Sequence, residues 1–274
     1  MNSLPEAAES ALTTQTIDGV TFLTLNRPRQ HNALSADLLD ALHVALDECG
    51  KDANLRVAVI AANGGAFCAG HDLKEMHAAN TLAFAQELFA RCTELMLKIA
   101  KLPVPVIAEV QGMATAAGCQ LVAQCDLAVA ADTAKFAVSG VNLGLFCSTP
   151  AVPLSRTISR KRAAEMLMTG EFIDAATALD WGLVNRVVPT ADLRAATLRL
   201  AESLKAKPRN ALALGKALFY RQMEAGMESA YADASATISG NFMDADAQEG
   251  VAAFLEKRKP DWRCGVECGC EGCA

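Results

Sequence analysis

Two segments of the chain carry the small residues that a backbone binding site for a negatively charged oxygen needs. Residues 57–76 read VAVIAANGGAFCAGHDLKEM, and residues 105–126 read PVIAEVQGMATAAGCQLVAQCD. Each places an apolar strand pattern, a loop of Gly and Ala, and a helix start in that order. Small residues let a ligand approach the backbone, and the first helical turn exposes N–H groups. Two such turns facing each other would form an oxyanion hole; either alone would serve tight strand–helix packing.

Other chemistries lack their motifs. The sequence has no G-x-G-x-x-G fingerprint, no G-x-x-x-x-G-K-[ST] phosphate loop and no G-x-S-x-G elbow. A Rossmann cofactor, ATP and a serine hydrolase of that type are therefore not predicted. The four histidines form no H-E-x-x-H pair, which disfavours a zinc hydrolase. His31 is assigned to a turn and His43 to a helix surface or boundary, without a catalytic role.

Composition bounds the protein class. The chain has 274 residues, 52% of them apolar and 20% charged, which favours a folded protein with a sizeable core. A net charge of −6 argues against nucleic acid or an anionic membrane as the main partner. No apolar run reaches the length of a membrane helix. The first ten residues, MNSLPEAAES, resemble neither a signal nor a transit peptide, so we expect a cytoplasmic protein.

The ten cysteines fall into two groups. Six occur singly in apolar surroundings and are expected to be reduced core thiols. The other four form a C-x3-C-x-C-x2-C pattern in a Gly-rich tail, and could chelate a soft metal or belong to a disordered, redox-labile tail. These four are Cys264, Cys268, Cys270 and Cys273.

Hydrophobic periodicity predicts an α/β fold. Residues 16–25 read as two short strands joined at Asp18-Gly19, a pair favoured in type I′ hairpins. Ser35 is a predicted N-cap of a helix that ends near Gly50. Continuous apolar runs predict strands buried on both faces, and their alternation with helices implies mainly parallel pairing. These runs are residues 56–61, 105–110 and 127–130.

The second part of the chain reads as helical. From about residue 191 the pattern is continuous helix apart from a stop at Pro208. The only boundary is the turn at residues 188–190. We expect a core over residues 12–190, a helical region over residues 191–262 and the cysteine-rich tail over residues 263–274. The helices are expected to pack on the same body or on a neighbouring subunit.

Several motifs in consistent order resemble one known family. The chain is similar to the crotonase (enoyl-CoA hydratase/isomerase) superfamily over about residues 12–262. GVNLGLFCSTP and TAAGCQLVA further resemble a sub-branch of it. The matching stretches are LNRPRQHNALS at 25–35, AFCAGHDLKEM at 66–76, PVPVIAEVQGMATAAGCQLVAQCD at 103–126, AKFAVSGVNLGLF at 134–146 and ALDWGLVNRVVP at 178–189.

The resemblance implies a fold, an assembly and a ligand. The implied fold is a spiral of ββα units with a C-terminal helical trimerisation region, assembled as a homotrimer or a dimer of trimers. The implied ligand is an acyl-CoA thioester, with coenzyme A as part of the substrate and no separate cofactor or metal. The motif positions assign the carbonyl-binding N–H groups to His71 and Ala117. The positions that would line the pantetheine and adenine groove are Asn32, Ala33, Asp72, Leu73 and Lys74.

Two departures from the family pattern concern proton transfer. A hydratase needs two carboxyl groups with opposed protonation roles. The family places them at positions that here are Gln120 and Gly140. Glutamine can orient a water but cannot take its proton, and glycine can do neither. The sub-branch resembled by residues 140–150 also lacks this pair.

Three other side chains could substitute for the two carboxylates. Ser148 lies eight residues after Gly140, where other superfamily members place an aspartate, and Cys147 is adjacent. A hydroxyl or thiol beside an activated thioester could act as a nucleophile, although no base is evidently placed to activate it. The His71 side chain could handle protons or narrow the pocket. Asp126 is interpreted as structural, and Lys74 as a phosphate contact or an ordinary solvated lysine.

We therefore expect an acyl-CoA-binding crotonase-type protein that stabilises a thioester enolate but hydrates weakly or not at all. One alternative is an isomerase or thioesterase-like enzyme that uses other proton handlers. The other is a non-catalytic acyl-CoA-binding regulatory protein.

Overall fold

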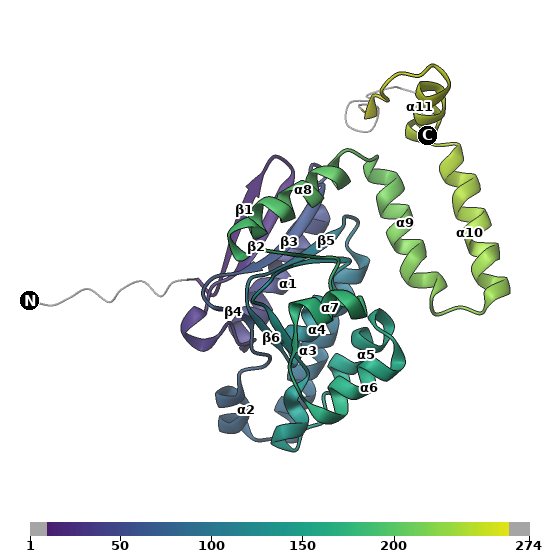
Figure 1. The fold of residues 1–274 in the computed structure, drawn as a ribbon. Helices are drawn as coiled ribbons and strands as arrows, with labels where there is room; N and C mark the ends of the chain where they lie inside the picture. Colours follow the sequence, from purple (N-terminus) through teal and green to yellow (C-terminus); the bar gives the residue numbers. More distant parts are fainter. Residues whose placement is uncertain (1–9, 263–274) are drawn as a thin grey trace, which may run out of the picture.

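A computed structural model describes residues 10–262; the cysteine-rich tail of residues 263–274 and residues 1–9 lie outside the described part. Its elements are labelled in Figure 1. The strands are β1 Leu12–Ile17, β2 Val20–Leu25, β3 Val57–Ala62, β4 Ala66–Cys68, β5 Val106–Val110, β6 Met113–Thr115, β7 Leu127–Ala131, β8 Lys135–Ala137, β9 Ile173–Asp174 and β10 Arg186–Val188. The α-helices are α1 Ala36–Lys51, α2 Leu73–Ala79, α3 Leu82–Lys101, α4 Ala117–Gln124, α5 Ser148–Thr157, α6 Arg160–Thr169, α7 Ala175–Trp181, α8 Leu193–Lys205, α9 Arg209–Gln222, α10 Met227–Phe242 and α11 Ala245–Leu255. The 3-10 helices are η1 Pro28–Gln30, η2 Ser139–Leu143 and η3 Thr190–Asp192.

Successive strands alternate between two sheets. One sheet has the order β1-β2-β3-β5-β7-β10 and the other β4-β6-β8-β9. Each pair β3–β4, β5–β6 and β7–β8 therefore contributes one strand to each sheet, and helices follow before the next pair. The pairings β3–β5, β5–β7, β4–β6 and β6–β8 are all parallel. The predicted α/β class and spiral of ββα turns are confirmed.

Local sequence signals place the first elements. β1 and β2 pair antiparallel, and both residues between them have positive φ, 47° at Asp18 and 73° at Gly19, as a type I′ turn requires. The Ser35 side chain accepts a hydrogen bond from the Leu38 N–H and caps α1. α1 ends near Gly50, as predicted, but Gly50 is not the residue that follows and caps the helix. α1 continues to Lys51, and its cap, Asp52, has φ −79°, so no left-handed residue is needed there.

The central strands of the six-stranded sheet, β2, β3, β5 and β7, are buried on both faces. One face packs in the larger apolar cluster, which also holds side chains of α1, α3 and α4. The other face packs against α8, where Leu193, Ala196 and Leu200 meet Phe22 and Val59. Burial on both faces explains why β3 and β5 read as continuous apolar runs. The expected division at residue 190 stays a prediction. α8, which follows it in the sequence, packs on the core.

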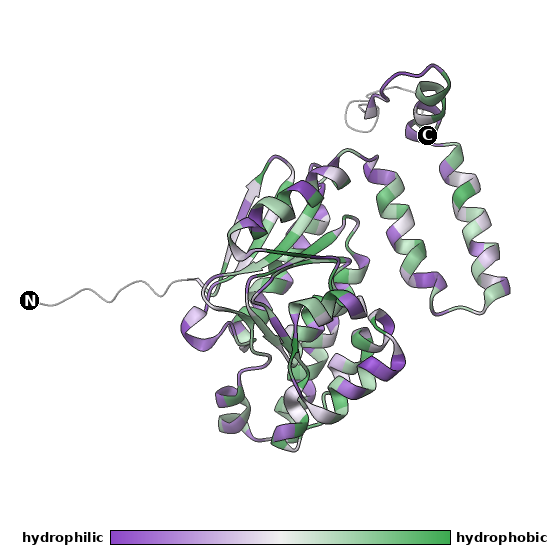
Figure 2. Ribbon diagram, in the orientation of Figure 1, coloured by the Kyte–Doolittle hydropathy of each residue, from purple (hydrophilic) through white to green (hydrophobic). Residues whose placement is uncertain are grey.

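α10 and α11 stand away from this core (Figure 1), whereas α9 contacts α3. α9 and α10 contain no buried residue, and Figure 2 shows hydrophobic residues along both. The larger exposed apolar side chains on α9, α10 and α11 are Phe219, Met227, Tyr231, Ile238, Phe242, Phe254 and Leu255. A surface of this kind is typical of an interface between proteins.

A buried ion pair fastens α9 to the core. The Lys216 ammonium lies 2.6 Å from the Asp126 carboxylate, and the two side chains are 8% and 16% exposed. It also donates hydrogen bonds to the carbonyl oxygens of Ile99 (2.8 Å) and Val104 (3.0 Å). Burial lowers the pKa of Lys216, and the charge of Asp126 opposes that shift.

Asp126 is the centre of the same contact. Its carboxylate accepts hydrogen bonds from the Val106 N–H at 2.7 Å and from the Tyr220 hydroxyl at 2.9 Å. Because Asp126 follows α4, the interaction joins α9 to the carboxyl end of that helix. The structural role predicted for Asp126 is confirmed. We refer to Lys216, Asp126 and Tyr220 as the α9 clamp.

No helix within residues 10–262 has the length and apolar character needed to cross a membrane.

Removing the cation of the α9 clamp should destabilise the fold. Lys216→Met leaves the buried Asp126 carboxylate without its charge partner, so we expect the free energy of unfolding to fall by about 3–5 kcal/mol. The matched control is Lys98→Met, because Lys98 pairs with Asp47 at an exposed site and such pairs contribute little. Urea denaturation of both variants measures the difference. Equal effects would show that the clamp is not a buried pair in solution.

Candidate functional site

The two Gly- and Ala-rich turns meet in space. A Cβ on Gly118, in the first turn of α4, would lie 2.1 Å from the carbonyl oxygen of Cys68 at the end of β4. A Cβ on Gly70 would lie 2.9 Å from the Ala116 Cβ and 3.3 Å from the Ala117 nitrogen. Neither approach is open to a residue with a side chain. The pairing of the two turns expected from sequence is thus present in the backbone.

Local geometry exposes the N–H groups at both turns. Leu34 donates to the Gly70 carbonyl and accepts from the Asp72 N–H, so the His71 N–H points away from this parallel bridge. Ala117 is the first residue of α4, whose initial N–H groups have no intrahelical acceptor. The preceding Ala116 has φ 51° and ψ −119°. Such a conformation is strained for alanine, and strain of this kind gathers at functional sites.

The position of the first missing carboxylate is occupied by a buried amide. Gln120 is 3% exposed, and its N–H donates to the Ala116 carbonyl at 3.0 Å within the first turn of α4. Its side-chain Oε1 is buried and has no hydrogen-bond partner within residues 10–262. An amide does not take up a proton near neutral pH, so Gln120 can form hydrogen bonds but cannot act as a general base.

The position of the second missing carboxylate is filled by backbone. η2, which begins at Ser139, is joined to the site by a 2.9 Å hydrogen bond between the Ser139 and Thr115 hydroxyls. A Cβ on Gly140 would lie 2.5 Å from the Leu145 carbonyl oxygen and 2.7 Å from the Cys147 Sγ. The loop that follows Gly140 therefore takes the space that a glutamate side chain would need.

Neither neighbouring nucleophile is activated in the described residues. The Ser148 hydroxyl is exposed and donates to the Phe146 carbonyl at 3.3 Å. Burial raises the pKa of the Cys147 thiol, although the Gly140 N–H opposes this, so the thiolate is disfavoured. Ser148 lies eight residues after Gly140 in the sequence. Within residues 10–262 it contacts no imidazole or carboxylate.

The His71 side chain is enclosed by α3. Its ring packs edge-on against Phe89, with centroids 5.4 Å apart and planes at 80°. The ring is largely buried, and the Leu34 carbonyl lies where it can accept a hydrogen bond from it. Burial lowers the pKa of His71 to about 4, and the Leu34 carbonyl acts in the opposite direction. The ring is therefore neutral at pH 7.

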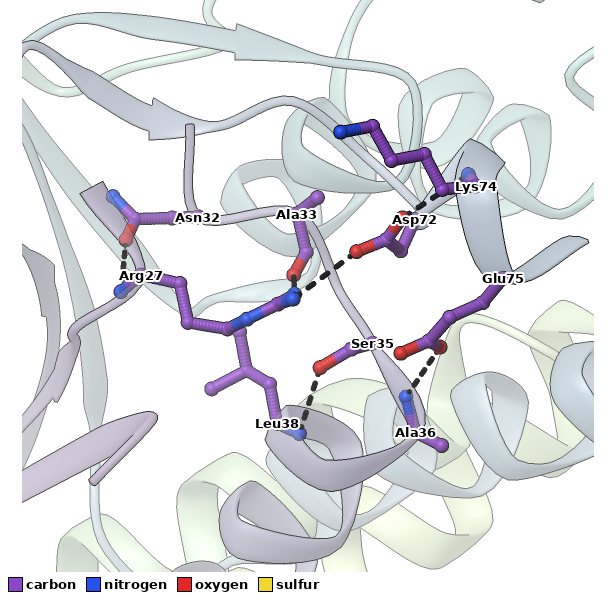
Figure 3. A network of polar contacts seen from close by, with 9 residues as sticks. All are labelled: Arg27, Asn32, Ala33, Ser35, Ala36, Leu38, Asp72, Lys74 and Glu75. Atoms are coloured by element: carbon purple, nitrogen blue, oxygen red, sulfur yellow. Dashed lines mark hydrogen bonds and ion pairs between the residues drawn. The ribbon is translucent and has the colours of Figure 1, made fainter. Parts of the chain in front are cut away.

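Four of the five predicted groove residues, all but Leu73, belong to a polar network drawn in Figure 3. Arg27 bridges two of them, donating to the Ala33 carbonyl at 2.6 Å and pairing with the Asp72 carboxylate at 3.1 Å. Asn32 is fully buried. Its Oδ1 accepts from the Arg27 N–H, and its Nδ2 donates to the Asn63 and Ala66 carbonyls. The Asn32 side chain thus holds the loop.

The first turn of α2 offers a surface to a ligand. Asp72 caps it by accepting from the Lys74 N–H. Leu73 is 52% exposed, and the Lys74 side chain is also exposed; in Figure 3 no dashed line reaches its ammonium. An apolar side chain next to a cation suits a ligand with a hydrocarbon part and a phosphate. The groove roles of these residues stay predictions.

Two contributors were not predicted from sequence. Arg27 lies within the matched stretch 25–35, but its contacts cross 45 residues to Asp72. Phe89 carries no motif and was assigned no role. Its spacing within α3 suits a helix face, and only the tertiary structure brings it to His71.

Enlarging Gly118 should disrupt the contact between the two turns. Gly118→Ala puts a methyl group against the Cys68 backbone, so we expect a loss of about 1–3 kcal/mol in the free energy of unfolding and weaker ligand binding. Gly65→Ala is the control, because a Cβ there has no neighbour within 4 Å. Urea denaturation measures the first effect. Equal stability of the two variants would contradict the close approach.

His71 should make folding stability depend on pH. Its pKa is about 4 in the folded chain against the ordinary histidine value of 6.5, so the unfolded state binds more protons between these values. Stability is therefore full above about pH 6.5 and falls as the pH drops toward 4, by up to about 3 kcal/mol. His71→Leu should lose this contribution. The unfolding free energy of the variant should change less between pH 7 and pH 4.5 than that of the unmodified chain. Parallel pH curves would contradict the buried neutral imidazole.

Comparisons with known proteins agree on one family. A family model described as "Enoyl-CoA hydratase/isomerase" matches residues 15–264. The chain is 46% identical over 257 residues to mouse enoyl-CoA hydratase domain-containing protein 3, covering 94% of the chain and 86% of the mouse protein. It is 46% identical over 246 residues to the human protein of that name, covering 90% and 81%. The predicted resemblance to this sub-branch is confirmed.

Solved structures show the same fold. A crystal structure of an enoyl-CoA hydratase from Mycobacterium smegmatis matches with 57% identity and a TM-score of 0.91, covering 93% of this chain and 99% of that one. The crystal structure of human enoyl-CoA hydratase domain-containing protein 3 matches with 44% identity and a TM-score of 0.89, covering 92% and 100%.

The expectation of a cytoplasmic protein is wrong. The mouse, rat, Xenopus and human relatives are all named mitochondrial proteins. The expectation depended on the first ten residues, most of which lie outside the described part. Similarity over nine-tenths of the chain is the stronger observation.

The match of the family model to residues 15–264, together with these relatives, establishes that the chain belongs to the enoyl-CoA hydratase/isomerase family.

Proposed function

We propose that the chain binds an acyl-CoA thioester and polarises its carbonyl group through the backbone N–H groups of His71 and Ala117. The observation that carries this proposal is the close approach of Gly70 and Gly118 to the opposite turn. That approach brings two helix starts together with their N–H groups uncommitted. Two donors aimed at one oxygen stabilise the negative charge of an enolate, each contributing about 10²–10³ in rate where a reaction follows.

Ligand-lining roles follow from the same placement. Leu73 and Lys74 would contact the pantetheine arm and a phosphate, while Asp72 and Ala33 hold the groove through Arg27. Coenzyme A is part of this ligand, and no further cofactor is proposed. The exposed apolar residues of α9 to α11 support a homotrimer or a dimer of trimers, because a closed symmetric assembly would cover them.

We propose further that classical hydration is weak or absent. Each missing acid–base group is worth about 10²–10⁴ in rate, and the two expected carboxylate positions are an amide at Gln120 and a crowded backbone at Gly140. The low pKa of His71 makes it a weak base, and Ser148 has no activating partner in the described residues. These observations favour an acyl-CoA-binding protein over a thioesterase or isomerase that uses these side chains.

Binding and turnover can be measured separately. Titration calorimetry of the full chain with acetoacetyl-CoA should give saturable binding, and crotonyl-CoA should show little or no loss of its enoyl absorbance. Gln120→Glu should not restore hydration because the second carboxylate is still absent. The double variant Gln120→Glu/Gly140→Glu should not hydrate crotonyl-CoA either, since the Cβ at position 140 would lie 2.5 Å from the Leu145 carbonyl oxygen.

Absence of binding to acetoacetyl-CoA would overturn the thioester proposal. Rapid hydration by the unmodified chain would overturn the argument from the missing carboxylates and leave the ligand class in place.

A further inference from the structure

One backbone carbonyl, that of Ala66 at the start of β4, accepts hydrogen bonds from two amide side chains. Nδ2 of Asn32 donates to it at 2.8 Å, and Nε2 of Gln111 donates to it at 3.0 Å. The two amides come from distant parts of the chain, the loop before α1 and the connection between β5 and β6. Each of these parts adjoins one of the two turns of the proposed carbonyl site.

The loop that carries Asn32 runs beside the turn at His71. Residues 31–34 and 69–72 share three backbone hydrogen bonds, of 2.8, 3.0 and 3.2 Å. The Asn32 side chain is fully buried, and it also donates to the Asn63 carbonyl at 2.9 Å. It therefore ties this loop both to the start of β4 and to the segment that precedes it.

Gln111 adjoins the other turn. It lies between β5 and β6, and β6 ends two residues before Ala117. Its Nε2 also donates to the Gly64 carbonyl at 3.0 Å. The two backbones are in direct contact here, because a Cβ on Gly112 would lie 2.1 Å from the Gly65 carbonyl oxygen. Gln111 therefore ties the β5–β6 connection to the same segment that Asn32 holds from the other side.

Strand pairing alone fixes the register of β4 on β6 weakly. The two strands are parallel, with Ala66 opposite Met113 and Cys68 opposite Ala114, and the register shifts between these two pairs. Such an irregularity changes where the following residues point. A slip of one residue moves a strand by about 3.3 Å, whereas a donor must lie about 2.7–3.1 Å from an oxyanion to stabilise it. Side-chain contacts at Ala66 therefore bear on the spacing of the two N–H donors.

We propose that Asn32 and Gln111 are positioning residues for the proposed carbonyl site. By sharing the Ala66 carbonyl, they set the spacing between its two N–H donors. This inference rests on the proposed function. Asn32 acts from behind the groove and does not line it, because its side chain is fully buried and its three hydrogen bonds go to backbone atoms. Both amides act through the backbone that they hold.

The test separates binding of the carbonyl from binding of the rest of the ligand. Titration calorimetry of the full chain compares butyryl-CoA with free coenzyme A, which lacks the acyl group. Infrared difference spectroscopy uses butyryl-CoA labelled with carbon-13 at the thioester carbonyl. Hydrogen bonds to that oxygen lower its stretching frequency, so we expect the unmodified chain to bind the thioester with a frequency below its value in water.

Two variants remove the shared contacts. Gln111→Met keeps a similar volume without the donor. We expect it to reduce the affinity for butyryl-CoA relative to coenzyme A by about three- to tenfold, the factor that one net hydrogen bond supplies. The carbonyl frequency should move back toward its value in water. Asn32→Asp replaces the donor by an oxygen facing two carbonyls and should have a larger effect on both measurements.

The matched control is Asn185→Leu. It also removes a hydrogen bond between an amide side chain and the backbone, in which Oδ1 of Asn185 accepts from the Ala128 N–H in β7. That contact touches neither turn. The control should therefore change neither the affinity ratio nor the carbonyl frequency, whatever it does to stability.

The outcomes separate this inference from the function on which it rests. Failure of the unmodified chain to bind butyryl-CoA, or binding without a lowered carbonyl frequency, overturns the proposed function. A lowered frequency that persists in Gln111→Met, with an unchanged affinity ratio, overturns the positioning role. Equal losses of affinity for butyryl-CoA and coenzyme A also overturn it, because they indicate a general structural role. If Asn32→Asp does not fold, Gln111→Met decides alone.

Discussion

The site depends on a contact in which two pieces of backbone touch with no side chain between them. At Gly118 the first turn of α4 rests on the carbonyl of Cys68, and at Gly70 the end of β4 rests on Ala116 and Ala117. Each glycine removes the Cβ that would hold the segments apart. The strained alanine at position 116 turns the chain into α4 at this point. The glycines at positions 70 and 118 and the turn at position 116 together allow this one close contact between the two backbones.

Local signals predicted much of the fold because their causes are local. Asp18-Gly19 can adopt two positive φ values, and Ser35 can cap the helix that follows it. Gly50 misled because glycine is also tolerated inside a helix, where a Cβ would meet only Leu102 at 3.7 Å. The two turns were identified by their small residues. The partners that complete the site, Arg27 and Phe89, depend on contacts across tens of residues, which no local pattern encodes.

The substitutions at the carboxylate positions differ in kind. At position 120 the buried glutamine has about the size of a glutamate but cannot take up a proton. At position 140 the loop has moved into the space, with the Leu145 carbonyl and Cys147 Sγ against the backbone. Restoring one glutamate is therefore a change of one atom type, while restoring the other requires a different loop. The resemblance implies a glutamate at both positions, and only the structure separates the two cases.

The α9 clamp holds its helix by charge and hydrogen bonds; the Lys216 side chain is buried, although α9 has no buried apolar residue. The Lys216 ammonium is held by one carboxylate and two carbonyl oxygens, which fixes where α9 attaches to the core. The contacts that orient α9 and its apolar side all lie within a single chain and need no second molecule.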